Sequence, residues 1–195
     1  MVTTGEGDVL PGPHVAKARR RSHGRRQAIE WAILVAGALI IAILIKTFLF
    51  QAFYIPSASM DPTLKVDDRV LVNKLSYHLH SVHRGDIVVF KAPPEERTEK
   101  IKDLVKRVIG LPGDTIESRD GQVYINDRRL KEPYLPKGTR TEDLPRTVIP
   151  AGHYFMMGDN RGASSDSRVF GPIARSTIIG RAFVKMWPFS RFGFL

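Results

Sequence analysis

Two serines that could act as nucleophiles, Ser57 and Ser59, lie in the segment IPSASMDPTL at residues 55–64, which has a proline near each end. A serine hydroxyl attacks a carbonyl carbon only when a neighbouring base takes its proton. The usual markers of such a serine are absent, because the sequence contains no G-x-S-x-G and no S-x-x-K pattern. The segment is therefore either a catalytic one with an unusual base or an ordinary turn at the start of a domain.

A lysine can be this base if its surroundings favour the neutral amine. The ordinary pKa of a lysine is about 10.4, and it must fall by about two units, or about 2.7 kcal/mol, before much neutral amine exists at pH 8. Burial among apolar side chains has this effect. Lys106 lies in the apolar segment LVKRVIG, whereas Lys100 and Lys102 lie in a charged stretch. Lys106 is the candidate base, and the alternative is an ordinary strand lysine whose amine reaches the solvent.

A third polar segment, MGDNRGASSDSR at residues 157–168, follows an apolar run. Its aspartate, asparagine, glycine and serine residues are typical of a tight loop held by side-chain hydrogen bonds. Asp166 and Arg168 are two residues apart, so their side chains can form an ion pair. The segment is either only a turn or a support for a neighbouring site.

Thiol and metal chemistry find little support in the sequence. The chain has no cysteine, which excludes a thiol nucleophile, a Cys-type zinc site and disulfide bonds. There is no H-E-x-x-H motif, and the one histidine cluster is HLHSVH, with His78, His80 and His83. This cluster could bind a metal ion weakly, but a solvated loop is the simpler interpretation. We expect no metal and no cofactor.

The two serines follow closely on a hydrophobic segment. Residues 31–45 are fifteen consecutive apolar or glycine residues, and the wider stretch 28–50 carries charge only at Glu30 and Lys46. A helix over 28–50 would be about 34 Å long, enough to cross the roughly 30 Å hydrocarbon core of a bilayer. A cleaved signal peptide is the alternative, but the bulky residues after Ile45 offer no nearby small-x-small cleavage site. We predict a transmembrane anchor over 28–50.

The charges before this segment indicate its orientation. The sequence KARRRSHGRR at residues 17–26 carries six basic residues and no acidic one. Such clusters favour the cytoplasmic side of a membrane helix. We predict that residues 1–27 are a disordered cytoplasmic tail and that residues 51–195 are extracytoplasmic. The formal net charge of +10 could also suit nucleic acid, but no nucleic-acid-binding motif supports that partner.

The sequence after the anchor is typical of an antiparallel β domain. Short β-rich runs at 66–75 and 85–91 are bounded by turn formers, and more such runs follow. Asp120-Gly121 between two β-rich runs favours a two-residue hairpin turn. Residues 132–150 are rich in proline and are predicted to be an irregular excursion. The predicted fold is mainly β: one N-terminal transmembrane helix and one β-rich domain over 51–195.

Three segments in order, IPSASMDPTL, KRVIGLPGD and GDNRGASSDSR, resemble the motif boxes of the bacterial type I signal peptidases, or leader peptidases. The resemblance covers roughly residues 28–190, and three motifs in the family's order make it very specific. It implies an extracytoplasmic antiparallel β-sheet domain of the signal peptidase and repressor-protease type. It also implies a membrane-bound serine endopeptidase that removes N-terminal signal peptides from exported preproteins with small residues at −1 and −3.

The resemblance implies a Ser/Lys dyad for this activity. Ser59, the second serine of the first box, would be the nucleophile, and Lys106 would be the general base and later the acid for the leaving amine. The hydroxyl of Ser57 and the backbone N–H of Ser59 would stabilise the developing oxyanion. Removal of one such donor typically costs about 3 kcal/mol.

The last box would support the dyad by the same resemblance. Ser164 would orient the amine of Lys106, and Asp166 and Arg168 would form a structural ion pair. Two departures from the family pattern occur: Ala58 replaces a glycine, and residues 162–163, Gly-Ala, replace Asp-Asn. The first requires that the backbone φ of Ala58 is not strongly positive, and the second could loosen the loop that holds Ser164.

The resemblance also implies which residues and partners meet the substrate. A substrate would add as an extended strand along 53–56 and 103–106. The implied pocket-lining residues, each otherwise an ordinary core residue, are Phe53, Ile55, Met60, Leu64, Leu104 and Val105. The implied partners are preprotein signal peptides, the lipid bilayer and the neighbourhood of the secretion translocon.

Two other functions remain open from the sequence. One is a catalytically inactive membrane-anchored relative that binds secretory segments without cleaving them, against which the joint presence of Ser59, Lys106 and Ser164 argues. The other is a self-cleaving Ser-Lys regulator of the repressor type, against which the anchor and the lack of a DNA-binding domain argue.

Overall fold

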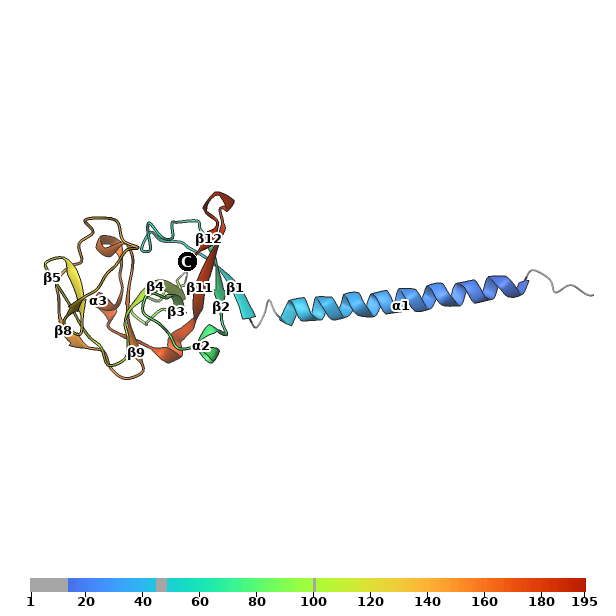
Figure 1. Ribbon diagram of the computed structural model, residues 1–195, viewed down its shortest axis with the longest axis horizontal. Helices are drawn as coiled ribbons and strands as arrows, with labels where there is room; N and C mark the ends of the chain where they lie inside the picture. Colours follow the sequence, from blue (N-terminus) through green and yellow to red (C-terminus); the bar gives the residue numbers. More distant parts are fainter. Residues whose placement is uncertain (1–13, 45–48, 100) are drawn as a thin grey trace, which may run out of the picture. The chain divides into compact units, whose positions relative to one another are not determined.

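The computed structural model describes residues 14–44, 49–99 and 101–195 of the chain (Figure 1). The chain divides into two compact units, residues 1–45 and residues 46–195. The first unit holds one long helix, α1 (His14–Leu44), and the second holds the strands.

The helix α1 has the composition of a membrane-spanning segment. Its portion from Gly24 to Leu44 has a mean hydropathy of 2.2 and is long and apolar enough to cross a membrane. Large apolar side chains are exposed along it, with Trp31 68% and Ile33 66% exposed. A helix that is apolar on all sides requires apolar surroundings.

The ends of α1 differ from the predicted helix over 28–50. The helix begins at His14, inside the segment predicted to be disordered, because Ala, Lys and Arg are good helix formers and continue the helix through the basic residues. It ends at Leu44, and the predicted helical residues 45–48 lie outside the described residues. Phe50 starts a strand instead, as expected for an aromatic run with high β propensity.

The second unit contains an eight-stranded antiparallel sheet that follows the order β1-β2-β11-β3-β4-β9-β10, with β12 paired to β11. Its strands are β1 (Phe50–Tyr54), β2 (Arg69–Asn73), β3 (Ile87–Lys91), β4 (Asp103–Gly110), β9 (His153–Met157), β10 (Ile173–Ala174), β11 (Ile178–Trp187) and β12 (Gly193–Phe194). The prediction of a mainly β protein with an N-terminal apolar helix is confirmed.

A smaller four-stranded sheet has the order β7-β6-β5-β8, and Figure 1 shows its strands β5 and β8 at the side of the unit opposite β1 and β2. Its strands are β5 (Thr115–Arg119), β6 (Gln122–Ile125), β7 (Arg128–Arg129) and β8 (Leu144–Val148). Asp120 and Gly121 join β5 to β6 with φ of 54° and 79°, which suits a tight hairpin turn. The excursion predicted at 132–150 is only partly irregular, because β8 lies inside it and pairs with β5.

Short helices complete the unit. They are α2 (Ser76–Leu79), η2 (Arg161–Ala163), α3 (Ser167–Phe170), η3 (Arg175–Thr177) and η4 (Phe189–Arg191). Three clusters of buried apolar side chains form the core, and one of them contains Ile55, Met60 and Leu64 together with Val70 and Val72 of β2.

Two of the strand edges that lack a neighbouring strand in the described part of the chain belong to β1 and to the first half of β4. The strand β1 pairs with β2 alone. The strand β4 pairs with β3 over its whole first half, but β9 joins its other edge only from Arg107 onward. Residues 103–106 of β4 therefore keep one open edge, next to which an extended peptide can form main-chain hydrogen bonds.

Candidate active site

In the segment between β1 and β2, buried apolar residues on both sides of Ser59 anchor the turn that carries it. Ile55, Met60 and Leu64 are at most 3% exposed and belong to the same core cluster. The backbone N–H of Leu64 donates to the carbonyl of Met60 at 2.9 Å, which closes a turn just after Ser59. Ser57 is exposed and Ser59 half-buried, so the apolar residues fix the turn while both hydroxyls remain accessible.

Lys106 lies on β4 and points its amine at this turn. Its Nζ donates a hydrogen bond to Ser59 Oγ at 2.6 Å, and the residue is only 3% exposed. Burial lowers the pKa of Lys106 to about 8, although the nearby carboxylates of Asp166 and Glu96 partly oppose this effect. A lysine with such a pKa is partly neutral near physiological pH and can accept a proton.

Two hydrogen-bond donors converge next to Ser59 Oγ. The hydroxyl of Ser57 lies 3.3 Å from Ser59 Oγ. The backbone N–H of Ser59 donates to no group among the described residues. A second hydroxyl thus lies beside Ser59 Oγ, and the N–H of the same residue is without a partner in the described part of the chain.

The loop after β9 donates hydrogen bonds to the backbone carbonyls of the Ser59 turn. The N–H of Asn160 donates to the Ser59 carbonyl and its Nδ2 donates to the Ala58 carbonyl, both at 3.1 Å. A Cβ on Gly158 would lie 2.4 Å from the Ser59 carbonyl oxygen and 2.2 Å from Ser164 Oγ. Only glycine fits at residue 158, because the loop and the turn approach each other so closely.

Ser164 is placed beside the dyad without a bond to it. Its Oγ is buried and has no hydrogen-bond partner among the described residues. The hydroxyl of Ser164 nevertheless lies close enough to the Asp166 carboxylate to help lower its pKa. Its oxygen can still accept a hydrogen bond from a group that enters or moves within the site.

Asp166 and Arg168 form an ion pair at the end of the same loop. Arg168 Nε lies 2.8 Å from Asp166 Oδ1, and its Nη2 lies 2.8 Å from Oδ2. Asp166 Oδ2 also accepts a hydrogen bond from the Gly158 N–H at 2.9 Å. Burial alone would raise the pKa of Asp166, but the hydrogen bonds from Arg168 and Gly158 outweigh burial and lower it. The carboxylate therefore stays charged and fixes the loop.

A small pocket of about 70 Å³ opens beside the two serines and Lys106. It is bounded by residues of β1 and its following turn on one side and by residues of β4 on the other. Of the predicted substrate-binding residues, its lining includes Phe53, Ile55, Met60, Leu104 and Val105. Leu64 does not line it, because this side chain is 0% exposed and packs in the core with Ile55 and Met60.

No group of three or more His, Asp or Glu side chains is arranged to hold a metal ion in the described ranges. The histidine cluster interpreted as a solvated loop is only partly described, because nothing is described of the His78 side chain.

Comparisons with known proteins decide the family. The family model described as signal peptidase, peptidase S26, matches residues 28–187. The chain belongs to this family. Probable signal peptidase I-2 of Synechocystis is 43% identical over 86% of this chain and 77% of its own length. Signal peptidase IB of Staphylococcus aureus is 38% identical over 86% of this chain and 94% of its own length.

A solved structure of a signal peptidase I from Enterococcus faecalis is also similar. It is 34% identical and matches 52% of this chain and 97% of that one, with a TM-score of 0.44. Membership of the signal peptidase family rests on the sequence matches, and the fold class rests on the strands described above.

The departures from the signal peptidase motifs are accommodated in the structure. Ala58 is not among the residues with positive φ, so its Cβ causes no backbone strain. Gly162 and Ala163 lie in η2, where the Ala163 N–H donates to the Asn160 carbonyl at 3.0 Å. The backbone itself therefore closes this part of the loop.

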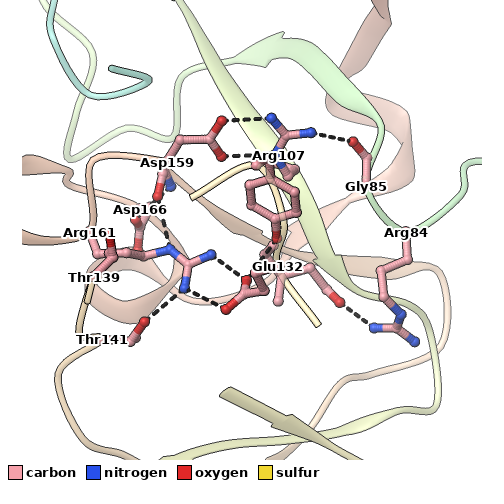
Figure 2. Close-up of polar contacts among 12 residues, drawn as sticks. Arg84, Gly85, Arg107, Glu132, Thr139, Thr141, Asp159, Arg161 and Asp166 are labelled. Atoms are coloured by element: carbon pink, nitrogen blue, oxygen red, sulfur yellow. Dashed lines mark hydrogen bonds and ion pairs between the residues drawn. The ribbon is translucent and has the colours of Figure 1, made fainter. Parts of the chain in front are cut away.

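A buried ion pair that was not predicted from the sequence lies on the other face of β4. Arg107 donates from Nε and Nη2 to the two oxygens of Asp159, at 2.8 and 2.6 Å, and from Nη1 to the Gly85 carbonyl at 2.9 Å (Figure 2). Thr63, four residues after Ser59, donates its hydroxyl to Asp159 Oδ2 at 2.5 Å. The pair thus ties together the serine turn, β4 and the last loop.

A second buried pair joins the 132–150 segment to that loop. Arg161 binds Glu132 and also donates to Thr141 Oγ1 at 2.7 Å and to the Gly158 carbonyl at 3.1 Å (Figure 2). The ring of Tyr134 lies under the Arg107 guanidinium, 3.9 Å away. Arg107, Asp159 and Arg161 lie inside the second and third motifs, and Glu132 lies between them in the sequence. Nothing in the sequence indicates how these charged residues pair.

Proposed function

We propose that this protein is a membrane-anchored serine endopeptidase that removes signal peptides from exported preproteins with a Ser59/Lys106 dyad. The observation that carries the proposal is the 2.6 Å contact between a buried, partly neutral lysine amine and a serine hydroxyl. Membership of the signal peptidase family and the names of the relatives, which are signal peptidases, support the choice of substrate.

In the first step, neutral Lys106 takes the proton of Ser59 as its Oγ bonds to the carbonyl carbon at the cleavage site. The carbonyl oxygen becomes an oxyanion, for which the Ser57 hydroxyl and the Ser59 N–H are the available donors. The protonated amine of Lys106 then gives its proton to the leaving nitrogen as the C–N bond breaks. Water attacks the resulting acyl ester, with Lys106 again as the base, and Ser59 is regenerated.

Ser164 would orient the amine through these steps. Its buried Oγ lacks a partner in the described part of the chain, and it lies beside Gly158 and thus beside the Ser59 carbonyl. A movement of the Lys106 amine away from Ser59 would let it bind this oxygen. Asp166 and Arg168 would hold the loop in place for that contact.

The substrate would bind as a strand between the open edges of β1 and of residues 103–106 of β4. The pocket between these strands is only about 70 Å³ and is lined by apolar side chains such as Ile55 and Leu104. A pocket of this size favours small side chains at −1 and −3, and the buried Leu64 would support its lining from the core.

The membrane placement follows from the charge and composition of α1. The basic residues before Gly24 would stay in the cytoplasm, so that the catalytic unit lies outside, where signal peptides emerge from the secretion translocon. Exposed Trp187, Phe189, Phe192 and Phe194 near the C-terminus support contact of the catalytic unit with a lipid surface.

Cleavage of a preprotein with an Ala-x-Ala site by the full chain in detergent tests the proposal. We expect cleavage after the second alanine, its loss in Ser59→Ala, and normal cleavage by Ser176→Ala, which removes an exposed hydroxyl elsewhere. The rate should rise with pH through about 8 as Lys106 loses its proton. Cleavage retained in Ser59→Ala, or a rate that is flat from pH 6 to 10, would contradict the proposal.

A further inference from the structure

The loop between β3 and β4 contacts the loop after β9 through a carboxylate. Ser165 Oγ donates a hydrogen bond to Glu96 Oε1 at 2.6 Å. Ser165 stands between Ser164 and Asp166, and Glu96 is half-buried. The contact therefore fixes a negative charge beside the loop that lies next to the dyad.

The charged groups that act on Lys106 come from two segments. Asp159 and Asp166 with its partner Arg168 belong to the loop after β9, and Glu96 belongs to the loop before β4. Asp166 and Glu96 have the larger effects among the acids, and both raise the pKa of Lys106. The serine turn presents hydroxyls, which are neutral, at this amine.

These three acids differ in whether a cation compensates them. Asp166 is paired with Arg168, and Asp159 is paired with Arg107. Glu96 forms no ion pair with any described residue, and its one side-chain bond is to the neutral Ser165. An arginine close to a carboxylate cancels most of its field at a distance. Among the described acids that act on Lys106, Glu96 is therefore the one without a paired cation.

We propose that Glu96 is a positioning residue that sets the pH at which Lys106 becomes the active base, acting from the place where Ser165 holds its carboxylate. The inference rests on the proposed function of Lys106. The negative charge stabilises the protonated amine, so it keeps the dyad protonated at neutral pH and delays its activation to higher pH.

The proposed effect of the Glu96 charge is testable, because its removal should increase activity at neutral pH. Glu96→Gln keeps the shape and an oxygen that accepts from Ser165 but removes the charge. We expect the midpoint of the pH–rate profile to fall by about half a pH unit and the rate at pH 7 to rise about 2- to 3-fold. The rate at the alkaline plateau should not change, because Lys106 is already neutral there.

Three further variants separate charge from structure. Glu95→Gln removes the same charge one residue earlier, from an exposed side chain, and should leave the profile unchanged. Glu96→Asp keeps the charge and should return the midpoint toward the wild-type value. Ser165→Ala releases the carboxylate without removing it and should shift the midpoint in the same direction as Glu96→Gln, but by less.

The titration of the Lys106 side chain by NMR provides a readout that does not depend on cleavage, with the signal identified by its loss in Lys106→Met. A lower titration midpoint of Lys106 in Glu96→Gln supports the inference, whether or not the wild-type protein cleaves a preprotein. Absence of cleavage by the wild type would contradict only the proposed function. An unchanged midpoint overturns the inference. A lower plateau rate with an unchanged midpoint also overturns it, because that result means a merely structural contact.

Discussion

Lys106 and Arg107 are neighbours on β4 with nearly the same burial, 3% and 7% exposed, yet their surroundings are opposite. Arg107 meets a carboxylate through two hydrogen bonds, a backbone carbonyl and an aromatic face. Lys106 meets one hydroxyl. The fully paired arginine serves to hold the structure together, whereas the poorly paired lysine, whose pKa burial lowers, can lose its proton.

The difference shows how one strand can carry both a reactive side chain, Lys106, and a structural side chain, Arg107, that fixes the surrounding segments. Alternate residues of a strand face opposite sides of the sheet, so adjacent cations are exposed to separate environments. The side of Lys106 is apolar and leads to the pocket, while the side of Arg107 joins three segments by polar contacts.

The largest effect is expected when the reactive cation is removed. Lys106→Met should lower turnover by at least about 10³-fold, because Ser59 loses its base. The same variant should be more stable at pH 7, by up to about 3 kcal/mol, since the pKa of Lys106 is near 8 in the folded protein and 10.5 in an ordinary lysine.

The pH dependence of that stability difference identifies its cause. Folding below pH 8 buries a cation in the wild type, and this cost disappears as pH rises through the window from about 8 to 10.5. Urea unfolding of both proteins at pH 7 and pH 10 measures the difference. A stability advantage of Lys106→Met that does not shrink at pH 10 would contradict the lowered pKa.

The second-largest effect is expected when the paired cation is removed. Arg107→Met should lower the free energy of unfolding by about 3–5 kcal/mol, because it leaves Asp159 buried without its partner. Arg107→Lys keeps the charge but not the two parallel bonds, and it should lose less. An equal free energy of unfolding for Arg107→Met and Lys106→Met would contradict the proposed difference in charge pairing between the two faces of β4.

A smaller effect is expected at the glycine where the loop meets the serine turn. Gly158→Ala should cost about 1–3 kcal/mol of stability and lower turnover further, because its Cβ would lie 2.4 Å from the Ser59 carbonyl. Gly162→Ala is the matched control, since nothing lies within 4 Å of a Cβ there. Thermal unfolding and cleavage rates of the two variants, measured side by side, decide whether the close approach matters.

The sequence allowed the fold class and the family to be predicted, because strand patterns and three ordered motifs are local signals. The burial of Lys106 could not be read from LVKRVIG, since a strand lysine can face either side. The Arg107–Asp159 pair was missed because 52 residues separate its members and only the folded sheet brings them together. Leu64 was expected to line the pocket but is buried in the core. The sequence alone does not distinguish an apolar turn residue that lines a pocket from one that packs in the core.

Element boundaries were the weakest part of the prediction. The basic residues before Gly24 are polar, which suggested disorder, but their helix propensity is high and α1 extends through them. Strand β8 contains Pro145 and lies in a proline-rich stretch, so its pairing with β5 was not expected. An edge strand tolerates proline, because one side of it forms no sheet hydrogen bonds.

The open edge of β4 also limits how long any peptide can stay bound. Only residues 103–106 lack a neighbour on that side, so an added strand gains few main-chain hydrogen bonds, each worth about 1 kcal/mol net. Long exposed edges invite aggregation with unfolded chains, whereas this short one binds loosely. On the proposed function, a cut product would therefore depart quickly from this edge, and the edge offers little template on which unfolded chains could form a growing sheet.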